Sequence, residues 1–130
     1  MRFRWYATLC LLALVGHGVQ AQTYPVRPVR MIVPFAPGGT ADIIGRPLAQ
    51  RLGETLGSSV VVDNRGGAGG SVGVILVAKA TPDGYTLLLG SSGAITIAPS
   101  LSKLSYDPAA DFAPIGMVAQ VVSAAGIKQE

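Results

Sequence analysis

The chain lacks most of the side chains that usually carry enzymatic or metal chemistry. Its 130 residues include one cysteine, one histidine and one tryptophan, which are Cys10, His17 and Trp5. All three lie within the first 21 residues, which have the pattern of an export signal. Once that segment is removed, the chain can form no disulfide, no zinc site built from Cys or His, and no Cys–His or Ser–His nucleophile pair.

Residues 1–21 are interpreted as a signal peptide. Arg2 and Arg4 supply a positive start, and Ala7–Val15 is an apolar run. The sequence that ends at Ala21 fits a small-x-small cleavage pattern. Because the apolar run is too short to span a bilayer, cleavage before Gln22 is favoured over retention as an uncleaved anchor. We therefore expect a periplasmic location.

The chain that remains is nearly neutral. Two of the ten basic residues lie in the signal, so eight remain against seven acidic residues, and the net charge falls from +3 to +1. No basic patch with interleaved aromatic residues is left, and nucleic acid is not an expected partner. About 109 residues without a linker or a repeat are enough for one small domain.

Short apolar runs alternate with helix-like segments along the chain. In chain order, the expected elements are the strand Val29–Val33, a helix from about Asp42 to Leu56, the strand Val60–Val62, a helix from Ser71 to about Ala80, the strand Tyr85–Leu89, a short helix over Ala94–Leu101 and the strand Ile115–Val122. This alternation favours an α/β fold, with a parallel sheet flanked by helices.

Capping and turn signals mark the ends of several elements. Thr40 is the expected N-cap of the first helix, and Asp42 lies in its first turn, where a negative charge is favoured. Pro47 is expected to kink this helix or to delay its start, and Gly57 is placed to end it. The segment Thr81–Gly84 predicts a turn in which the glycine takes a positive φ.

The segment Arg30–Asp42 predicts an anion-binding loop. An apolar strand runs into two prolines and two glycines, and a helix then opens at Thr40. This order directs backbone N–H groups and the positive end of a helix dipole toward one point. No lysine follows Gly39, so a carboxylate fits better than a nucleotide phosphate. The alternative is that Pro34–Thr40 is only a tight connection between a strand and a helix.

Two more glycine-rich loops follow the second and third expected strands. These are Asn64–Gly70 and Gly90–Gly93, and ligands of parallel sheets bind beyond such strand ends. The second loop lacks the third glycine of a dinucleotide fingerprint, because Val72 stands in its place. Ser91 and Ser92 either donate hydrogen bonds to a carboxylate or satisfy the backbone of their own loop.

Several polar residues near these loops are interpreted as structural. Asp42 would need a raised pKa to act as a general base, but a helix's first turn lowers the pKa, so helix capping is favoured. Asp63, Asn64 and Arg65 read as turn and surface groups rather than ligands. Tyr106 precedes Asp107 and Pro108, which suggest a rigid corner.

Four collinear motifs resemble one family. They are VRMIVPFAPGGTAD at Val29–Asp42, VVDNRGGAGG at Val61–Gly70, AKATPDGYTLLLG at Ala78–Gly90 and YDPAADFAPI at Tyr106–Ile115. Together they are similar to the Bug family, the periplasmic solute-binding receptors of tripartite tricarboxylate transporters. The resemblance extends from about Tyr24 to about Val121.

The resemblance implies a Venus-flytrap receptor with a cleft between two α/β domains. It implies capture of small carboxylates, such as dicarboxylates, tricarboxylates or amino acids, largely through backbone N–H groups and water. Integral membrane transporter subunits would be the partners of the intact form, with no cofactor, no metal and no catalytic residue. The ligand-binding residues expected on this basis are Pro37, Gly38, Gly39, Thr40, Asp42, Ala68, Gly69, Ser91 and Ser92.

The end of the chain departs from the family pattern. Residues 22–122 match an incomplete first solute-binding domain, and residues 123–130 read as a divergent tail. Truncation is therefore expected to impair solute capture. Two alternatives to a receptor are a non-functional remnant of one and a small exported enzyme that acts on a phosphorylated substrate. The absence of histidine and of a phosphate-loop lysine argues against the enzyme.

Overall fold

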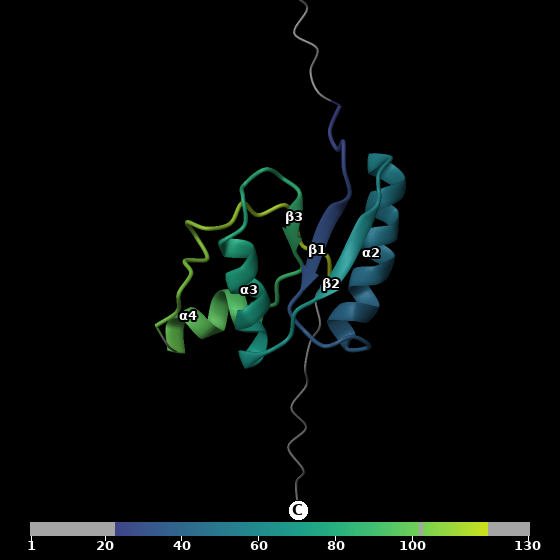
Figure 1. The fold of residues 1–130 in the computed structure, drawn as a ribbon. Helices are drawn as coiled ribbons and strands as arrows, with labels where there is room; N and C mark the ends of the chain where they lie inside the picture. The colour runs from purple at the N-terminus through teal and green to yellow at the C-terminus, as the bar shows by residue number, and fades with distance from the viewer. Residues whose placement is uncertain (1–22, 102, 120–130) are drawn as a thin grey trace, which may run out of the picture.

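The fold is built on a small parallel sheet. The computed structural model describes residues 23–101 and 103–119. Its three strands are β1 (Val29–Val33), β2 (Val60–Asn64) and β3 (Thr86–Leu88), in the order β2-β1-β3 (Figure 1). Val29 pairs with Val60 on one side of β1, and Arg30 pairs with Thr86 on the other. The predicted α/β class with a parallel sheet is confirmed.

Strand β1 is the centre of the core. Val29, Ile32 and Val33 are fully buried, and Met31 is nearly so. A strand with a neighbour on each side and a helix over each face has no exposed surface, which is why its sequence is almost entirely apolar. Arg30 is the exception, and its guanidinium forms an ion pair with Asp63 of β2.

The two main helices cover opposite faces of the sheet (Figure 1). Helix α2 (Thr40–Leu56) packs on β1 and β2, and helix α3 (Ser71–Ala78) packs on β3 and β1. Gly45 of α2 lies against Val33, whereas Gly73 of α3 lies against Pro34, the next residue along the chain. Successive residues of an extended segment point to opposite faces, so these two contacts place the helices on different sides.

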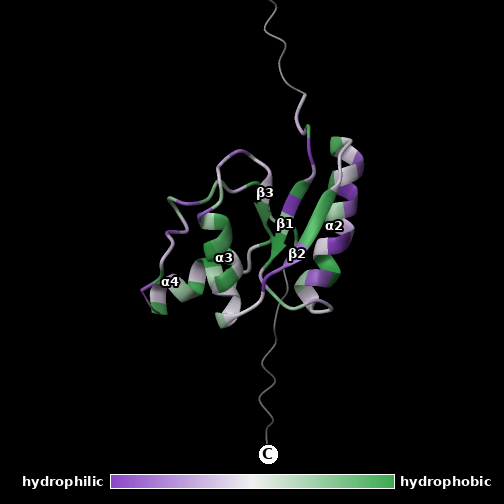
Figure 2. Ribbon diagram, in the orientation of Figure 1, coloured by the Kyte–Doolittle hydropathy of each residue, from purple (hydrophilic) through white to green (hydrophobic). Residues whose placement is uncertain are grey.

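Hydropathy follows this layering (Figure 2). The strands and α3 are mainly hydrophobic, while α2 carries hydrophilic residues along one side. Among the described residues, no helix combines the length and the apolar character needed to cross a membrane.

A second cluster of side chains holds the chain after β3 against α3. It contains Val74, Ala94 and Tyr106, all buried. The chain first forms the π-helical segment η3 (Gly93–Ile97) and the short helix α4 (Ala98–Leu101). The Tyr106 hydroxyl then donates a 2.6 Å hydrogen bond to the carbonyl of Ala94.

The predicted corner after Tyr106 is confirmed. The Asp107 carboxylate accepts hydrogen bonds from the N–H groups of Ala109 and Ala110, at 2.8 and 3.2 Å. An aspartate that accepts from the backbone two residues ahead is the usual mechanism of such a turn. Two other turn predictions are also confirmed, because Gly57 ends α2 with a φ of 67° and Gly84 has a φ of 80°.

Helix α2 differs from prediction at its start. Its N-cap is Gly39 rather than Thr40, and no side chain caps it at that position. The Asp42 carboxylate instead reaches back to the N–H of Gly38, so the charge stabilises the first turn from inside the helix. Pro47 does not delay the helix, which begins seven residues earlier. Pro47 lies on the exposed side of α2, away from the packed sheet.

The predicted fourth strand is not formed in the part of Ile115–Val122 that the structure describes. Residues 115–119 have no regular secondary structure, and Ile115 and Met117 are 85% and 84% exposed. The apolar pattern of a segment does not show whether a neighbouring strand is available for pairing, and a β-strand requires one. Residues 120–122, the signal peptide at 1–21 and the tail at 123–130 lie outside the described residues.

Gly73 offers a direct test of the packing between α3 and the end of β1. A Cβ atom at this position would lie 2.8 Å from the Pro34 Cβ and 2.9 Å from the Arg65 carbonyl oxygen. We expect Gly73→Ala to lower the free energy of unfolding by about 1–3 kcal/mol, because backbone atoms must move. Urea unfolding followed by circular dichroism measures this change.

Gly93→Ala is the matched control. Gly93 is also helical, but an added Cβ there meets no atom closer than 3.9 Å. This substitution should be neutral or slightly stabilising, because alanine has the higher helix propensity. Equal losses for the two variants would contradict the packing described for Gly73.

Candidate functional site

Three loops meet at the carboxyl end of the sheet. We call them the first loop (34–39), the second loop (65–70) and the third loop (89–92), which follow β1, β2 and β3. An added Cβ at Gly66 would lie 3.3 Å from the Ala36 nitrogen, and one at Gly70 would lie 3.4 Å from the Phe35 ring. The first and second loops therefore touch. The second loop ends in the 3₁₀ turn η2 (Ala68–Gly70), which lies against η3 of the segment after the third loop.

The first loop leads into helix α2, the third loop leads into η3, and the second loop ends in the η2 turn, where Ala68 and Gly69 have positive φ values of 46° and 66°. The first N–H groups of these three segments lie at this edge, and α2 is the long helix among them. In the two described stretches of chain, six of these groups form no hydrogen bond with the protein. They are the backbone N–H groups of Thr40, Ala41, Ala68, Gly69, Ser92 and Gly93. Helix N-termini carry partial positive charge, and their N–H donors suit an anion.

The two glycines of the first loop do not provide the donors that the sequence pattern suggested. The Gly38 N–H donates to the Asp42 carboxylate at 2.9 Å, and the Gly39 N–H donates to the Ala36 carbonyl at 3.4 Å. Gly38 has a φ of 80°, which shows why glycine is needed there. The available donors next to the first loop are therefore those of Thr40 and Ala41, the first two residues of α2, and Ala41 was not among the predicted residues.

Asp42 is buried beneath the first loop. Its side chain is 5% exposed, and both carboxylate oxygens accept hydrogen bonds. Oδ2 accepts from the Gly38 N–H and from Arg46 Nε at 2.8 Å, and Oδ1 accepts from Asn64 Nδ2 at 3.0 Å. The capping interpretation is supported, because both oxygens of Asp42 bond to groups of the first loop, β2 and α2.

The pKa of Asp42 is lowered to about 2 from the ordinary value of 3.8. The hydrogen bond from Arg46 is the main cause, followed by that from the Gly38 N–H, and both stabilise the ionised form. Burial opposes this shift without reversing it. The predicted lowering is confirmed, with a side-chain donor as its leading cause. An ionised, fully bonded carboxylate of this kind is not a general base near neutral pH.

Asn64 connects the second strand to the first loop. Its Nδ2 donates to the carbonyl of Phe35 at 3.1 Å as well as to Asp42. Sequence reasoning treated Asn64 as a turn or surface group, whereas the structure places it at the last position of β2, opposite Val33 of β1. No spacing along the chain could reveal this contact, because 29 residues separate Asn64 from Phe35.

Asp63 lies in β2 rather than in a turn, and it bonds to the arginines on either side of it in space. The Asp63 carboxylate accepts from Arg30 of β1, and Arg65 binds its other oxygen at 2.9 Å. The hydrogen bond from Arg30 is the main reason that the pKa of Asp63 lies below its ordinary value. The two arginines neutralise the Asp63 carboxylate and leave this group of three residues with one net positive charge.

The two serines of the third loop have different roles. Ser91 Oγ accepts a long hydrogen bond from the N–H of Ala94 at 3.4 Å, and its carbonyl accepts from the N–H of Ile95. Ser91 therefore satisfies its own helix start, which was one of the two alternatives. Ser92 is exposed, and its hydroxyl forms no hydrogen bond within the described residues.

Comparison with known proteins identifies the family. A family model described as the tripartite tricarboxylate transporter family receptor matches residues 44–126. The chain belongs to this receptor family. Protein BugT of Bordetella pertussis is 50% identical over 105 residues, which cover 79% of this chain and 32% of BugT.

Two solved structures share the fold of this receptor-family chain. The periplasmic binding protein BugD matches with a TM-score of 0.68 and 53% identity, over 72% of this chain and 31% of BugD. MatC from Rhodopseudomonas palustris, with bound malate, matches with a TM-score of 0.70 and 41% identity, over 73% of this chain and 33% of MatC. The chain thus spans about a third of the length of these relatives.

These matches confirm the resemblance to the Bug family. Members of the family are periplasmic solute-binding proteins and not enzymes, so the alternative of a small exported enzyme is set aside. Among the described residues, no three His, Cys, Asp or Glu side chains gather as a metal site would require.

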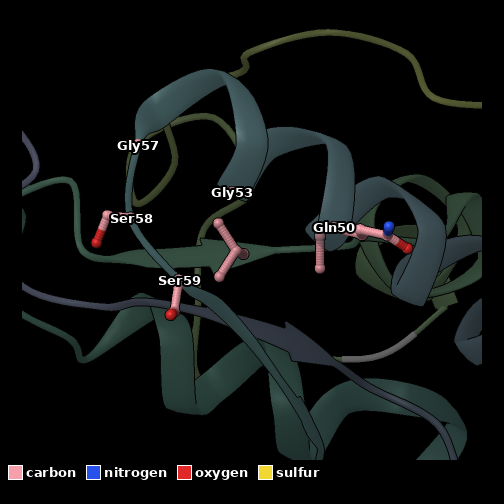
Figure 3. Close-up of a pocket in the computed structure, with 7 residues that line it drawn as sticks. Gln50, Gly53, Gly57, Ser58 and Ser59 are labelled. Atoms are coloured by element: carbon pink, nitrogen blue, oxygen red, sulfur yellow. The ribbon is translucent and has the colours of Figure 1, made fainter.

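The receptor chain also has an open hollow at the opposite end of the sheet (Figure 3). It lies between the carboxyl end of α2 and the start of β2. Its lining consists of Ala49, Gln50, Gly53, Gly57, Ser58, Ser59 and Val60. None of these side chains is charged, and the helix end nearby presents carbonyl groups, which repel an anion. The three loops are therefore the better candidate for binding a carboxylate.

Acid should reveal the contribution of Asp42 to the stability of this site. The folded-state pKa lies near 2 and the ordinary value is 3.8, so the carboxylate contributes its full stabilisation above about pH 4. Between about pH 4 and pH 2 the unfolded chain takes up the proton more readily, and this stabilisation is lost. We expect Asp42→Asn to remove that part of the acid dependence and to lower stability near neutral pH.

Urea unfolding at a series of pH values between 2 and 6 measures this dependence. Glu54→Gln is the control, because Glu54 is an exposed carboxylate on the same helix that also contacts an arginine, Arg51. The control should keep the acid dependence of the unsubstituted chain. If Asp42→Asn showed the same dependence of stability on pH as the unsubstituted chain, the acid-sensitive stabilisation could not be assigned to Asp42.

Proposed function

We propose that this chain is the first part of a periplasmic receptor that captures small carboxylates for a tripartite tricarboxylate transporter. The observation that carries the proposal is the group of six backbone N–H donors at the carboxyl end of the sheet, contributed by three separate loops. Donors of this kind recognise an oxyanion without a charged side chain. Membership in the receptor family and the malate bound to MatC support a carboxylate as that anion.

Backbone recognition fits the chemistry of the described residues near the loops. The aspartates near the loops are neutralised by arginines, so they do not repel an anion strongly. The donors are spread over three loops, which suits a ligand with more than one carboxylate oxygen. Thr40 and Ser92 add exposed hydroxyl groups beside these donors.

The intact receptor would hold the solute between this unit and a second domain. The relatives are about three times as long as the chain, and we propose that their additional length supplies the opposing side of the cleft. Hinge closure around the anion would present a closed complex to integral membrane subunits. Residues 1–21 would direct export, and residues 22–122 would form the partial domain.

The six donors lie at one edge of the sheet, and the proposed opposing domain lies outside the described residues, so we expect weak binding. Malate, added to the isotopically labelled chain, should shift the amide NMR signals of the six donor residues with a dissociation constant of about 1 mM. Citrate, succinate, glutamate and aspartate complete the panel. Amide signals of Gly57 and Ser58, at the opposite end of the sheet, should stay in place.

Dimethyl malate is the ligand control, because it keeps the carbon skeleton but has no charge. Equal shifts with the diester would show that the response is not carboxylate recognition. An absence of shifts with all five acids would contradict the proposed function. A micromolar dissociation constant would contradict the expectation of weak binding while supporting the function.

Thr40→Pro tests whether the backbone itself is the donor. Proline is accepted at the first position of a helix, where it removes the N–H group together with the threonine hydroxyl, so a variant that lacks only the hydroxyl is the necessary comparison. Gly39 has a φ of −76° and a ψ of 170°, a conformation that is favoured before proline. We expect malate affinity to fall about threefold to tenfold, with little change in stability.

Thr40→Ala is the matched control, because it removes the hydroxyl and keeps the N–H group. It should bind malate more tightly than Thr40→Pro. If Thr40→Ala loses as much affinity as Thr40→Pro, the hydroxyl rather than the N–H group is the important donor. NMR titration under identical conditions compares the two variants directly.

A further inference from the structure

Asp42 and Asn64 join three separate parts of the candidate site. Asp42 lies in the first turn of α2, Asn64 ends β2, and both contact the first loop. We infer that these two residues form a positioning clamp, which holds the first loop so that the N–H groups of Thr40 and Ala41 face the solute. The inference rests on the proposed function and extends it to residues that do not touch the ligand.

The clamp depends on a group that only accepts hydrogen bonds. Three donors converge on the Asp42 carboxylate, from Gly38, Arg46 and Asn64, at distances of 2.8–3.0 Å. A carboxylate can accept all three, whereas an asparagine of the same shape would turn one NH₂ group toward another donor. The buried position of Asp42 makes such a mismatch disruptive, since water cannot readily replace the lost partner.

Asn64 connects the end of β2 to the first loop and to α2. Its Nδ2 group donates to Asp42 and to the carbonyl of Phe35, the second residue of the first loop. The position of Asn64 is fixed by its register opposite Val33 at the end of β1. The first loop is therefore held at Phe35 and at Gly38, on both sides of its exposed tip at Ala36 and Pro37.

The clamp also decides which N–H groups remain available. It occupies the Gly38 N–H, and the carbonyl of Gly39 accepts from the N–H groups of Asp42 and Ile43. The N–H groups of Thr40 and Ala41 lie between these bonded positions and have no partner within the described residues. Arg46 forms an ion pair with Asp42, so the buried charge is compensated and does not oppose an incoming anion.

Three variants and one control test the clamp. Asp42→Asn reverses the polarity of one hydrogen-bonding position, Asn64→Ala removes the bridging amide, and the double variant combines them. Glu54→Gln is the control, because Glu54 is a carboxylate on α2 that contacts Arg51 at 3.1 Å but lies away from the first loop. Amide NMR of the whole chain reports the Gly38 hydrogen exchange rate and the malate affinity in one sample.

Each single variant should accelerate exchange of the Gly38 N–H by about tenfold and weaken malate binding by about tenfold. In the double variant, the Gly38 exchange rate and the malate dissociation constant should each exceed those of the more strongly affected single variant by no more than about twofold. The two residues act through the same loop, so their effects should not add. Glu54→Gln should change neither quantity. The clamp would be overturned if the effects of the two substitutions on malate affinity were fully additive. It would also be overturned if the single variants stayed within about twofold of the unsubstituted chain in malate affinity and Gly38 exchange rate.

A pH titration of the unsubstituted chain covers the case in which a variant fails to fold. The amide signal of Gly38 should move with a midpoint near pH 2, where the pKa of Asp42 lies, since protonation alters its acceptor. A Gly38 signal that does not respond to acid in the folded chain would also overturn the clamp.

Failure of the clamp and failure of the proposed function give different results. If the unsubstituted chain shows no response to malate or to the other acids, the receptor proposal fails, while the Gly38 exchange rates still test the clamp. If malate shifts the six donor signals equally in the unsubstituted chain and in Asp42→Asn, the receptor proposal stands and the positioning role is wrong.

Discussion

The parallel pairing of β1 with both of its neighbours is the interaction on which the rest of the structure depends. It buries β1 completely and brings the ends of three strands to one edge of the sheet. Parallel strands require a crossover connection, so α2 and α3 each start near that edge after β1 and β2. The convergence of the three loops at the candidate site is thus a consequence of strand order.

Side chains and backbone have separate roles at this edge. The polar side chains of Asp42, Asn64 and Asp63 are directed at the protein itself, where they tie loops and strands together. Several backbone N–H groups, by contrast, have no partner among the described residues. A site made of backbone donors depends little on which side chains surround it, so loop shape becomes the property that must be maintained. That division explains why buried polar contacts gather beneath loops made mostly of glycine, alanine and proline.

Much of the fold could be predicted because its signals are local. The apolar run of β1, the left-handed glycine that ends α2 and the turn before β3 each follow from a few adjacent residues. Errors arose where a side chain could choose between partners or where a contact came from another segment. The N-cap is Gly39 rather than Thr40, and the Asp42 carboxylate accepts from the nearby Gly38 N–H. Residues 115–119 form no strand, and strand pairing requires a neighbouring strand that the hydrophobic pattern of one segment does not reveal.

The sequence by itself determined the family, the α/β alternation and the three loops that meet the solute in our proposal, since these are written in short runs of residues and in their order. The tertiary structure alone decided which groups in those loops are available. It paired the Gly38 N–H with Asp42, left those of Thr40 and Ala41 without a partner among the described residues, and brought Asn64 to Phe35 and Asp42. The physical reason is that a polar group bonds to whichever partner the fold brings near, and for Phe35 and Asp42 one such partner comes from the end of β2.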